Sequence, residues 1–173
     1  IKPSMASRIV IKLGGGLITD KSSMKKFDSE AVERVAETIS SVIEIGIPAI
    51  IVHGAGSFGH LLAKEWSISG GVDQKIAEEQ RMVIDQIRTD MRELNGLVMD
   101  KFADLKLESE GLPPSNWAIG TGSSFQGDIT NFERVPQEPI PVTFGDVVNT
   151  NDSLEFGILS GDDLMVRLAR ELE

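Results

Sequence analysis

The sequence contains no cysteine, which excludes disulfide bonds and thiolate metal sites. It contains no apolar stretch near the roughly 20 residues that a membrane-spanning helix needs. Its first residues also lack the basic, apolar and small-residue order of a secretory signal peptide. From these absences we expect a protein of the reducing cytoplasm that has no membrane partner.

Positive charge is also scarce. The chain has 17 Lys and Arg against 27 Asp and Glu, for a formal net charge of −10. A surface that binds nucleic acid needs clustered basic side chains to neutralise the phosphates. We therefore expect no nucleic-acid partner, and any site for an anion has to be local.

The 173 residues, 40% of them apolar, are enough for one hydrophobic core and too few for two, so we expect a single domain over residues 1–173. Residues 8–13 (RIVIKL) are typical of a buried strand that ends in a glycine turn, Gly14–Gly16. A helix is predicted from the capping pair Asp28–Ser29 to Gly46, and a second strand at 50–52. Strands that alternate with helices indicate an α/β fold with a mostly parallel sheet between helices.

The remaining segments are less regular. Residues 73–105 carry a helical apolar stripe, which Gly96 could divide in two, and which we assign to the core or to a subunit interface. Loops and short hairpin strands are expected over 106–138. Short strands are expected at 139–142 and 156–159, followed by a helix that starts with acidic residues, where the helix dipole favours negative charge.

The second strand ends in VHGAGSFGH, in which Gly54, Gly56 and Gly59 match the spacing G-x-G-x-x-G. A dinucleotide site requires these glycines to open a full crossover helix, with a strand and an acidic residue close behind. That context is missing, because the short stretch after Gly59 is interrupted at residues 67–71. The alternatives are a glycine turn whose backbone N–H groups bind a phosphate, or a turn that serves packing only.

A second glycine turn favours the phosphate. Ligands of parallel α/β sheets bind at the carboxyl ends of the strands, so both turns should line one crevice. Lys12, Lys21 and His60 lie close to them in sequence, and Asp162 lies at the start of a later helix. Cations beside a phosphate-binding turn suit phosphoryl transfer, which depends on positioning and electrostatics. The P-loop and protein-kinase motifs are absent.

Each candidate also has a structural alternative. Lys12 on a buried strand requires an anion or a carboxylate as partner, whereas Lys21, beside further lysines, could lie on a solvated face. His53 we assign to the structure. Asp162 could be a helix-capping acid, and the role of Asp146 stays open.

Four segments carry a resemblance: IKLGGGLITDK (11–21), VHGAGSFGH (52–60), PVTFGDVV (141–148) and ILSGDDL (158–164). Together they resemble the successive motifs of the amino acid kinase family, and specifically its isopentenyl phosphate kinase branch. The resemblance implies a carbamate kinase-like N-terminal domain. It also implies ATP and Mg²⁺ as cofactors and a small phosphorylated acceptor, most specifically isopentenyl phosphate.

The resemblance further implies the site residues. Those expected to face ATP are Lys12, Gly14, Gly15, Gly56 and Asp162. Those expected to face the acceptor are Ala55, His60 and Gly145. Lys12, Lys21, His60 and Asp162 are the expected catalytic residues, with Lys21 stabilising the transferring group and Asp162 holding the lysines. No protein ligands for a metal are expected, because Mg²⁺ would bridge the ATP oxygens.

The sequence departs from the family pattern at Gly16, where Ser is usual, and at Ala55, where Gly is usual. The family's chain also continues well beyond residue 173. We therefore expect this chain to be the acceptor-binding half, without the C-terminal ATP-binding part, inactive by itself and homodimeric. The tail of the acceptor is expected near residues 76–91 and 113–117. The alternatives are a fosfomycin kinase-like phosphonate kinase and a non-catalytic phosphate-binding or oligomerisation fragment.

Overall fold

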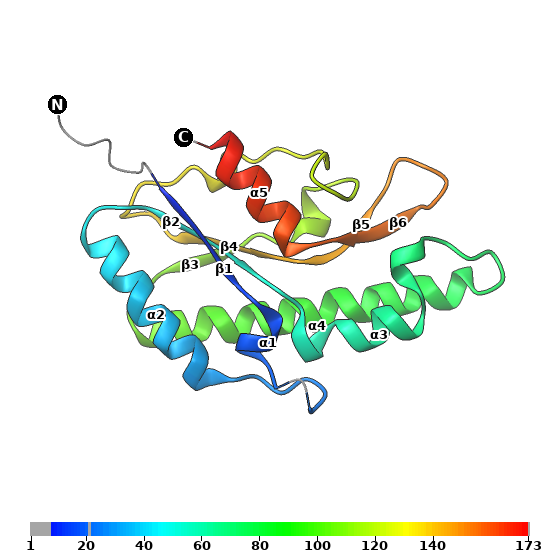
Figure 1. The fold of residues 1–173 in the computed structure, drawn as a ribbon, viewed down its shortest axis with the longest axis horizontal. Helices are drawn as coiled ribbons and strands as arrows, with labels where there is room; N and C mark the ends of the chain where they lie inside the picture. The colour runs from blue at the N-terminus through cyan, green and yellow to red at the C-terminus, as the bar shows by residue number, and fades with distance from the viewer. Residues whose placement is uncertain (1–7, 21, 173) are drawn as a thin grey trace.

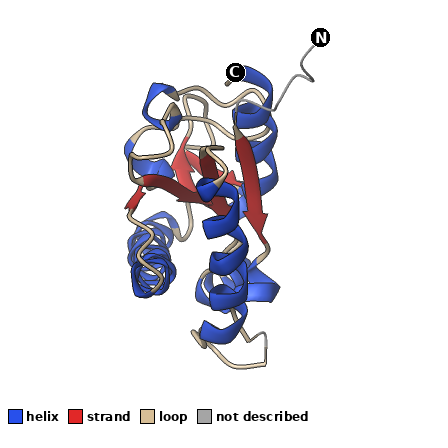
Figure 2. Ribbon diagram, turned by 90° about the vertical axis from the view of Figure 1, so that its left-hand side faces the viewer, coloured by secondary structure: helices blue, strands red, loops and turns tan. Residues whose placement is uncertain are grey.

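The computed structural model describes residues 8–20 and 22–172, so Lys21 lies outside the described residues. A parallel sheet occupies the centre, with α2, α3 and α4 on one side and α5 on the other (Figure 1). The turned view in Figure 2 shows the strands enclosed by helices on both sides. The α/β class predicted from the sequence is confirmed.

The sheet has four strands in the order β1-β2-β4-β3, and all its pairings are parallel. The strands are β1 (Ile9–Leu13), β2 (Ala49–His53), β3 (Ser109–Gly111) and β4 (Ile140–Phe144). Every residue of the central strands β2 and β4 is buried. The expectation of a buried first strand is wrong, because β1 lies at the edge and only its Leu13 is buried.

Two long helices cover one face of the sheet. The first, α2 (Ser29–Glu44), begins as predicted at Asp28, whose carboxylate accepts a hydrogen bond from the Ala31 N–H at 3.0 Å. The second, α4 (Ala77–Asp104), packs against α2, β3 and β4. The apolar stripes of both helices pack with Ile51 of β2 in the larger of two hydrophobic clusters.

The opposite face packs against α5 (Gly161–Glu171). Side chains alternate along β2, so Ile50 and Val52 lie in this second cluster while Ile51 lies in the first. Leu164 and Leu168 of α5 contribute to the second cluster, as expected from their four-residue spacing.

The segment between Leu105 and Ile140 differs from the expectation. Instead of hairpin strands it contributes β3, which pairs in parallel with β4, and an isolated antiparallel bridge between Ile119 and Gln126. The sequence also gave no indication of a two-stranded antiparallel sheet, β5 (Asp146–Asn149) with β6 (Phe156–Leu159). The other short elements are α1 (Gly15–Ile18), α3 (His60–Glu65), η1 (Gly56–Phe58), η2 (Ile68–Gly70), η3 (Pro114–Asn116) and η4 (Thr130–Phe132).

Within residues 8–20 and 22–172, none of the helices combines the length and apolar character needed to cross a bilayer.

Gly96 does not divide the helical pattern, since α4 is continuous through it. A Cβ atom at Gly96 would meet no described heavy atom within 4 Å. The same is true of Gly46, but Gly46 follows α2 with a φ of +84°. The two glycines therefore differ in backbone conformation and not in available space.

We expect opposite effects from alanine at these two glycines. Gly96→Ala should raise the free energy of unfolding by about 1 kcal/mol, because alanine is the better helix former. Gly46→Ala should lower it by about 1 kcal/mol, because alanine is strained at positive φ. Urea unfolding of both variants checks the signs, and destabilisation by Gly96→Ala would contradict the open, continuous helix.

Candidate active site

The three neighbouring strands β1, β2 and β4 end side by side. Leu13 is paired in register with His53, and His53 with Phe144. The residue after each strand is a glycine, namely Gly14, Gly54 and Gly145. Backbone hydrogen bonds continue across this row, from the Gly54 N–H to Leu13 O at 2.9 Å and from the Gly145 N–H to His53 O at 3.0 Å. Three glycine turns therefore meet at one edge of the sheet.

The first two turns pack backbone against backbone. A Cβ atom at Gly15 would lie 2.2 Å from the Gly56 nitrogen, and one at Gly54 would lie 2.7 Å from the Gly15 nitrogen. Gly56 also has a φ of +50°. Thr19 joins the turns, since its hydroxyl donates to Gly15 O at 2.6 Å and accepts from the Ser57 N–H at 3.0 Å. Glycine is required here for close approach.

Two adjoining cavities open along this edge. The first, of about 240 Å³, is bordered by Lys12, Gly15, Ala55, His60, Gly145 and Asp162, among others. The second, of about 530 Å³, is bordered by Gly14, Gly15, Gly16, Gly56, Ser57, His60 and Leu61. Every candidate site residue in the described part of the chain thus borders one or both cavities. The remaining candidate, Lys21, lies outside the described residues.

Lys12 and Asp162 form an ion pair at the first cavity. Their side chains are 32% and 74% exposed, so the pair contributes little to stability and mainly holds the ammonium group at the cavity. Asp162 does not cap α5. The cap is Ser160, whose hydroxyl accepts from the Asp163 N–H at 3.1 Å and donates to the Asp163 carboxylate at 3.0 Å. The capping alternative for Asp162 is therefore wrong.

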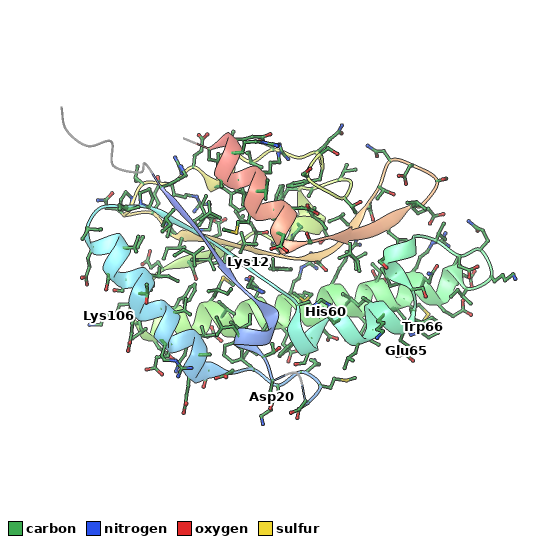
Figure 3. All side chains as sticks on the ribbon, viewed as in Figure 1. Lys12, Asp20, His60, Glu65, Trp66 and Lys106 are labelled. Carbon is green, nitrogen blue, oxygen red and sulfur yellow. The ribbon has the colours of Figure 1, made fainter. Side chains whose placement is uncertain are left out.

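His60 is the first residue of α3 and is exposed. It borders both cavities, whereas Glu65 at the other end of α3 borders neither. Figure 3 labels Lys12, His60 and Glu65 and shows that Lys12 and His60 come from different elements near the centre of the molecule. An imidazole placed there can contact a group in either cavity.

His53 has a structural role, as the sequence indicates. It is fully buried and stacks on Phe144 with ring centroids 5.0 Å apart. Its Nδ1 lies 3.0 Å from Gly54 O, and its Nε2 lies 3.1 Å from the Asn95 amide nitrogen. The neutral tautomer with the proton on Nδ1 satisfies both contacts. Burial lowers the pKa of His53 from 6.5 to about 4.

The rest of the first cavity is largely apolar. Its hydrocarbon wall is formed by Ala63, Ile87, Met91, Val147 and Ile158. Ile87 and Met91, within the 76–91 helix, border this cavity, whereas residues 113–117 do not. Sequence reasoning missed the wall from β5 and β6, since it did not identify β5 as a strand. It also left open Asp146, which borders the cavity and is 3% exposed.

A sequence model of the amino acid kinase family matches residues 7–173. The chain belongs to the amino acid kinase family. Two curated relatives are isopentenyl phosphate kinases. The chain is 28% identical over 171 residues to that of Methanocaldococcus jannaschii and 30% identical over 166 residues to that of Thermoplasma acidophilum. These alignments cover 95% of the chain but only 65% and 63% of the two relatives.

The solved structures agree with this assignment. An isopentenyl phosphate kinase structure superposes with a TM-score of 0.81 at 30% identity, and the match covers 91% of this chain and 64% of that one. An aspartate kinase from Synechocystis, at 17% identity and a TM-score of 0.63, shares the fold. The chain therefore spans a little under two thirds of the length of these isopentenyl phosphate kinases.

The burial of His53 predicts a pH dependence of stability. Between pH 4 and 6.5 the unfolded chain binds a proton at His53 that the folded chain does not. The contribution of His53 to stability should therefore be complete above pH 6.5 and fall by about 1.4 kcal/mol per unit as the pH drops toward 4. His53→Gln should lose this dependence in urea unfolding measured from pH 4.5 to 7.5.

The other of the chain's two histidines supplies the control. His60→Gln makes the same substitution at an exposed position and is the matched control. An unchanged slope in His53→Gln would contradict a neutral, buried imidazole.

Proposed function

We propose that the chain is the acceptor-binding part of a phosphotransferase that transfers a phosphoryl group from ATP to isopentenyl phosphate, giving isopentenyl diphosphate. The observation that carries this proposal is the first cavity, which combines Lys12 and His60 with a hydrocarbon wall beside three glycine turns. The names of the curated relatives point to the same acceptor.

The polar end of the cavity suits the acceptor phosphate. His60 can donate a hydrogen bond to an anion in either tautomer, and Ala55 and Gly145 border the same cavity. No general base is needed there, because the acceptor phosphate is already ionised at neutral pH. Lys12, which is held by Asp162, is proposed to stabilise the negative charge that develops on the phosphoryl group during its transfer.

The apolar end suits a short hydrocarbon tail. Ala63, Ile87 and Met91 face it from two helices, and Val147 and Ile158 from the β5–β6 pair. A volume of about 240 Å³ accommodates a small ligand. The five hydrocarbon side chains of the wall favour a prenyl phosphate over the smaller and more polar tail of a phosphonate such as fosfomycin.

The glycine-rich lining of the second cavity suits the phosphate groups of Mg²⁺–ATP. Gly14, Gly15 and Gly56 line this cavity with backbone and without side chains, which suits phosphate groups. Among the described residues, no cluster of three or more His, Asp or Glu could hold a metal ion. Mg²⁺ would therefore be held mainly by ATP oxygens, and Mg²⁺–ATP would supply the phosphoryl group. We keep Lys21 as the proposed second cation.

A homodimer in the cytoplasm completes the proposal. The resemblance to the family supports the homodimer, and the lack of cysteine supports the cytoplasm. Met82 of α4, whose side chain is 74% exposed, is a candidate for the contact between subunits. Light scattering of the purified chain tests the dimer.

His60 provides the direct test of acceptor binding. His60→Ala should weaken the binding of isopentenyl phosphate by about tenfold or more at pH 7, because a hydrogen bond to a charged group is lost. Glu65→Ala, at the far end of α3, is the matched control and should bind like the wild type. Calorimetric titration measures both, and equal affinities in the two variants would remove His60 from the site.

A panel of ligands separates the alternatives. Isopentenyl phosphate should bind at least about tenfold more tightly than inorganic phosphate, because each buried CH₂ contributes roughly 0.8 kcal/mol. Ala63→Leu should remove this preference and leave the affinity for inorganic phosphate unchanged. Tighter binding of fosfomycin would favour the phosphonate kinase, and equal binding of all three ligands would favour the non-catalytic module.

A further inference from the structure

Asp146 is a buried acid at the cavity that the proposed function does not use. It is the first residue of β5, follows Gly145 directly and is 3% exposed. Its Oδ1 accepts a hydrogen bond from the Val147 N–H at 2.8 Å. Its Oδ2 is buried and has no hydrogen-bond partner among residues 8–20 and 22–172.

The nearby arginines of α4 do not satisfy this oxygen. Arg88 donates from Nε to Val147 O at 3.0 Å and from Nη2 to Asn149 Oδ1 at 3.2 Å. Arg92 donates from Nη2 to Ser115 Oγ at 3.3 Å and to Asn116 Oδ1 at 3.0 Å. Both arginines favour the ionised form of Asp146 from a distance, without a direct bond.

The other elements around Asp146 bring few charges. On β6 its partner in register is the apolar Leu159. The backbone of Gly145 bonds to His53 of β2, a buried and neutral imidazole. The charged or titratable groups that share the cavity with Asp146 are Lys12, His60 and Asp162, of which Lys12 and Asp162 are paired with each other.

A structural role does not account for this arrangement. The single bond from the Val147 N–H needs one acceptor oxygen, which Asn or Ser could provide. A second oxygen that is buried and unpartnered is unfavourable when ionised. Burial accordingly raises the pKa of Asp146 from 3.8 to about 6, against the smaller opposing effects of the Val147 N–H and the two arginines. The carboxyl group thus gains or loses its proton close to neutral pH.

We propose that Asp146 is a residue of the acceptor site whose carboxyl group takes up a proton when a phosphate-bearing acceptor enters the cavity. This inference rests on the proposed function. The proton comes from solvent and binds the carboxylate, so that the acceptor anion meets a neutral carboxyl group instead of a second negative charge. Without this proton, the acceptor anion would lie beside a carboxylate that is largely removed from water, and the two negative charges would repel each other.

The direction of the pH dependence follows from this linkage. The protonated protein is the binding-competent form, and its fraction falls tenfold per pH unit above the pKa of the free carboxyl. Acceptor affinity of the wild type should therefore fall as the pH rises above about 6, by up to about tenfold per unit relative to a variant that is neutral at this position.

Calorimetric titration with isopentenyl phosphate from pH 5.5 to 8 tests this, in two buffers of different ionisation enthalpy. At pH 7.5 the wild type should take up close to one proton more than Asp146→Asn, and its affinity should fall relative to that of the variant as the pH rises. The titration of the ligand phosphate is common to both proteins and cancels in the difference. Asp85→Asn, which removes an exposed acid of α4, is the charge-matched control and should follow the wild type.

An infrared difference spectrum of the wild type supplies a readout that needs no substitution. Binding at pH 7.5 should produce the C=O stretch of a protonated carboxylic acid, which an ionised carboxylate lacks. Absence of this band, equal proton uptake in wild type and Asp146→Asn, or loss of binding by a folded Asp146→Asn at every pH would each overturn the inference. Failure of the wild type to bind isopentenyl phosphate at any pH would instead reject the proposed function.

Discussion

The site depends on the contact of two backbones at the edge of the sheet. The turn after β1 and the turn after β2 approach so closely that neither Gly15 nor Gly56 can carry a side chain. This contact requires β1 and β2 to be parallel and in register, so that the two turns leave the sheet at the same level. The Thr19 hydroxyl bonds to both turns. The two cavities border this junction and share Gly15 and His60.

The electrostatics of the first cavity depend on a few local groups, because the chain as a whole carries a net charge of −10. Lys12 is the positive group and is held by Asp162 on α5. Close to it, burial keeps His53 neutral, which supports the sheet without adding charge. Burial also shifts Asp146 toward its neutral form, with a pKa of about 6. The first cavity thus has one paired cation, and burial reduces the negative charge of Asp146 beside it.

The sequence predictions succeeded where the interactions lie within one segment and failed where they join segments that are distant in sequence. The helix at residues 29–44 was predictable because its cap and its apolar spacing lie within one segment. Gly96 was misleading, since the packing of α4 against the sheet outweighs the weak helix preference of one glycine. The burial of β1 was overestimated because apolar composition does not reveal a strand's place in the sheet. The strand β5 was missed because it exists through its pairing with β6.

The sequence by itself determined the parallel α/β fold, the glycine turns after the strands and, by resemblance, the family. Apolar periodicity, turn residues and contiguous motifs are local properties, so they can be recognised without coordinates. Only the tertiary structure decided that Ser160 and not Asp162 caps α5, that Ile87 and Met91 are residues of the 76–91 helix that border the cavity, and that Asp146 is buried with one oxygen unpartnered. Partners, burial and pKa depend on segments that are distant in sequence, and the order of residues does not specify which of those segments meet.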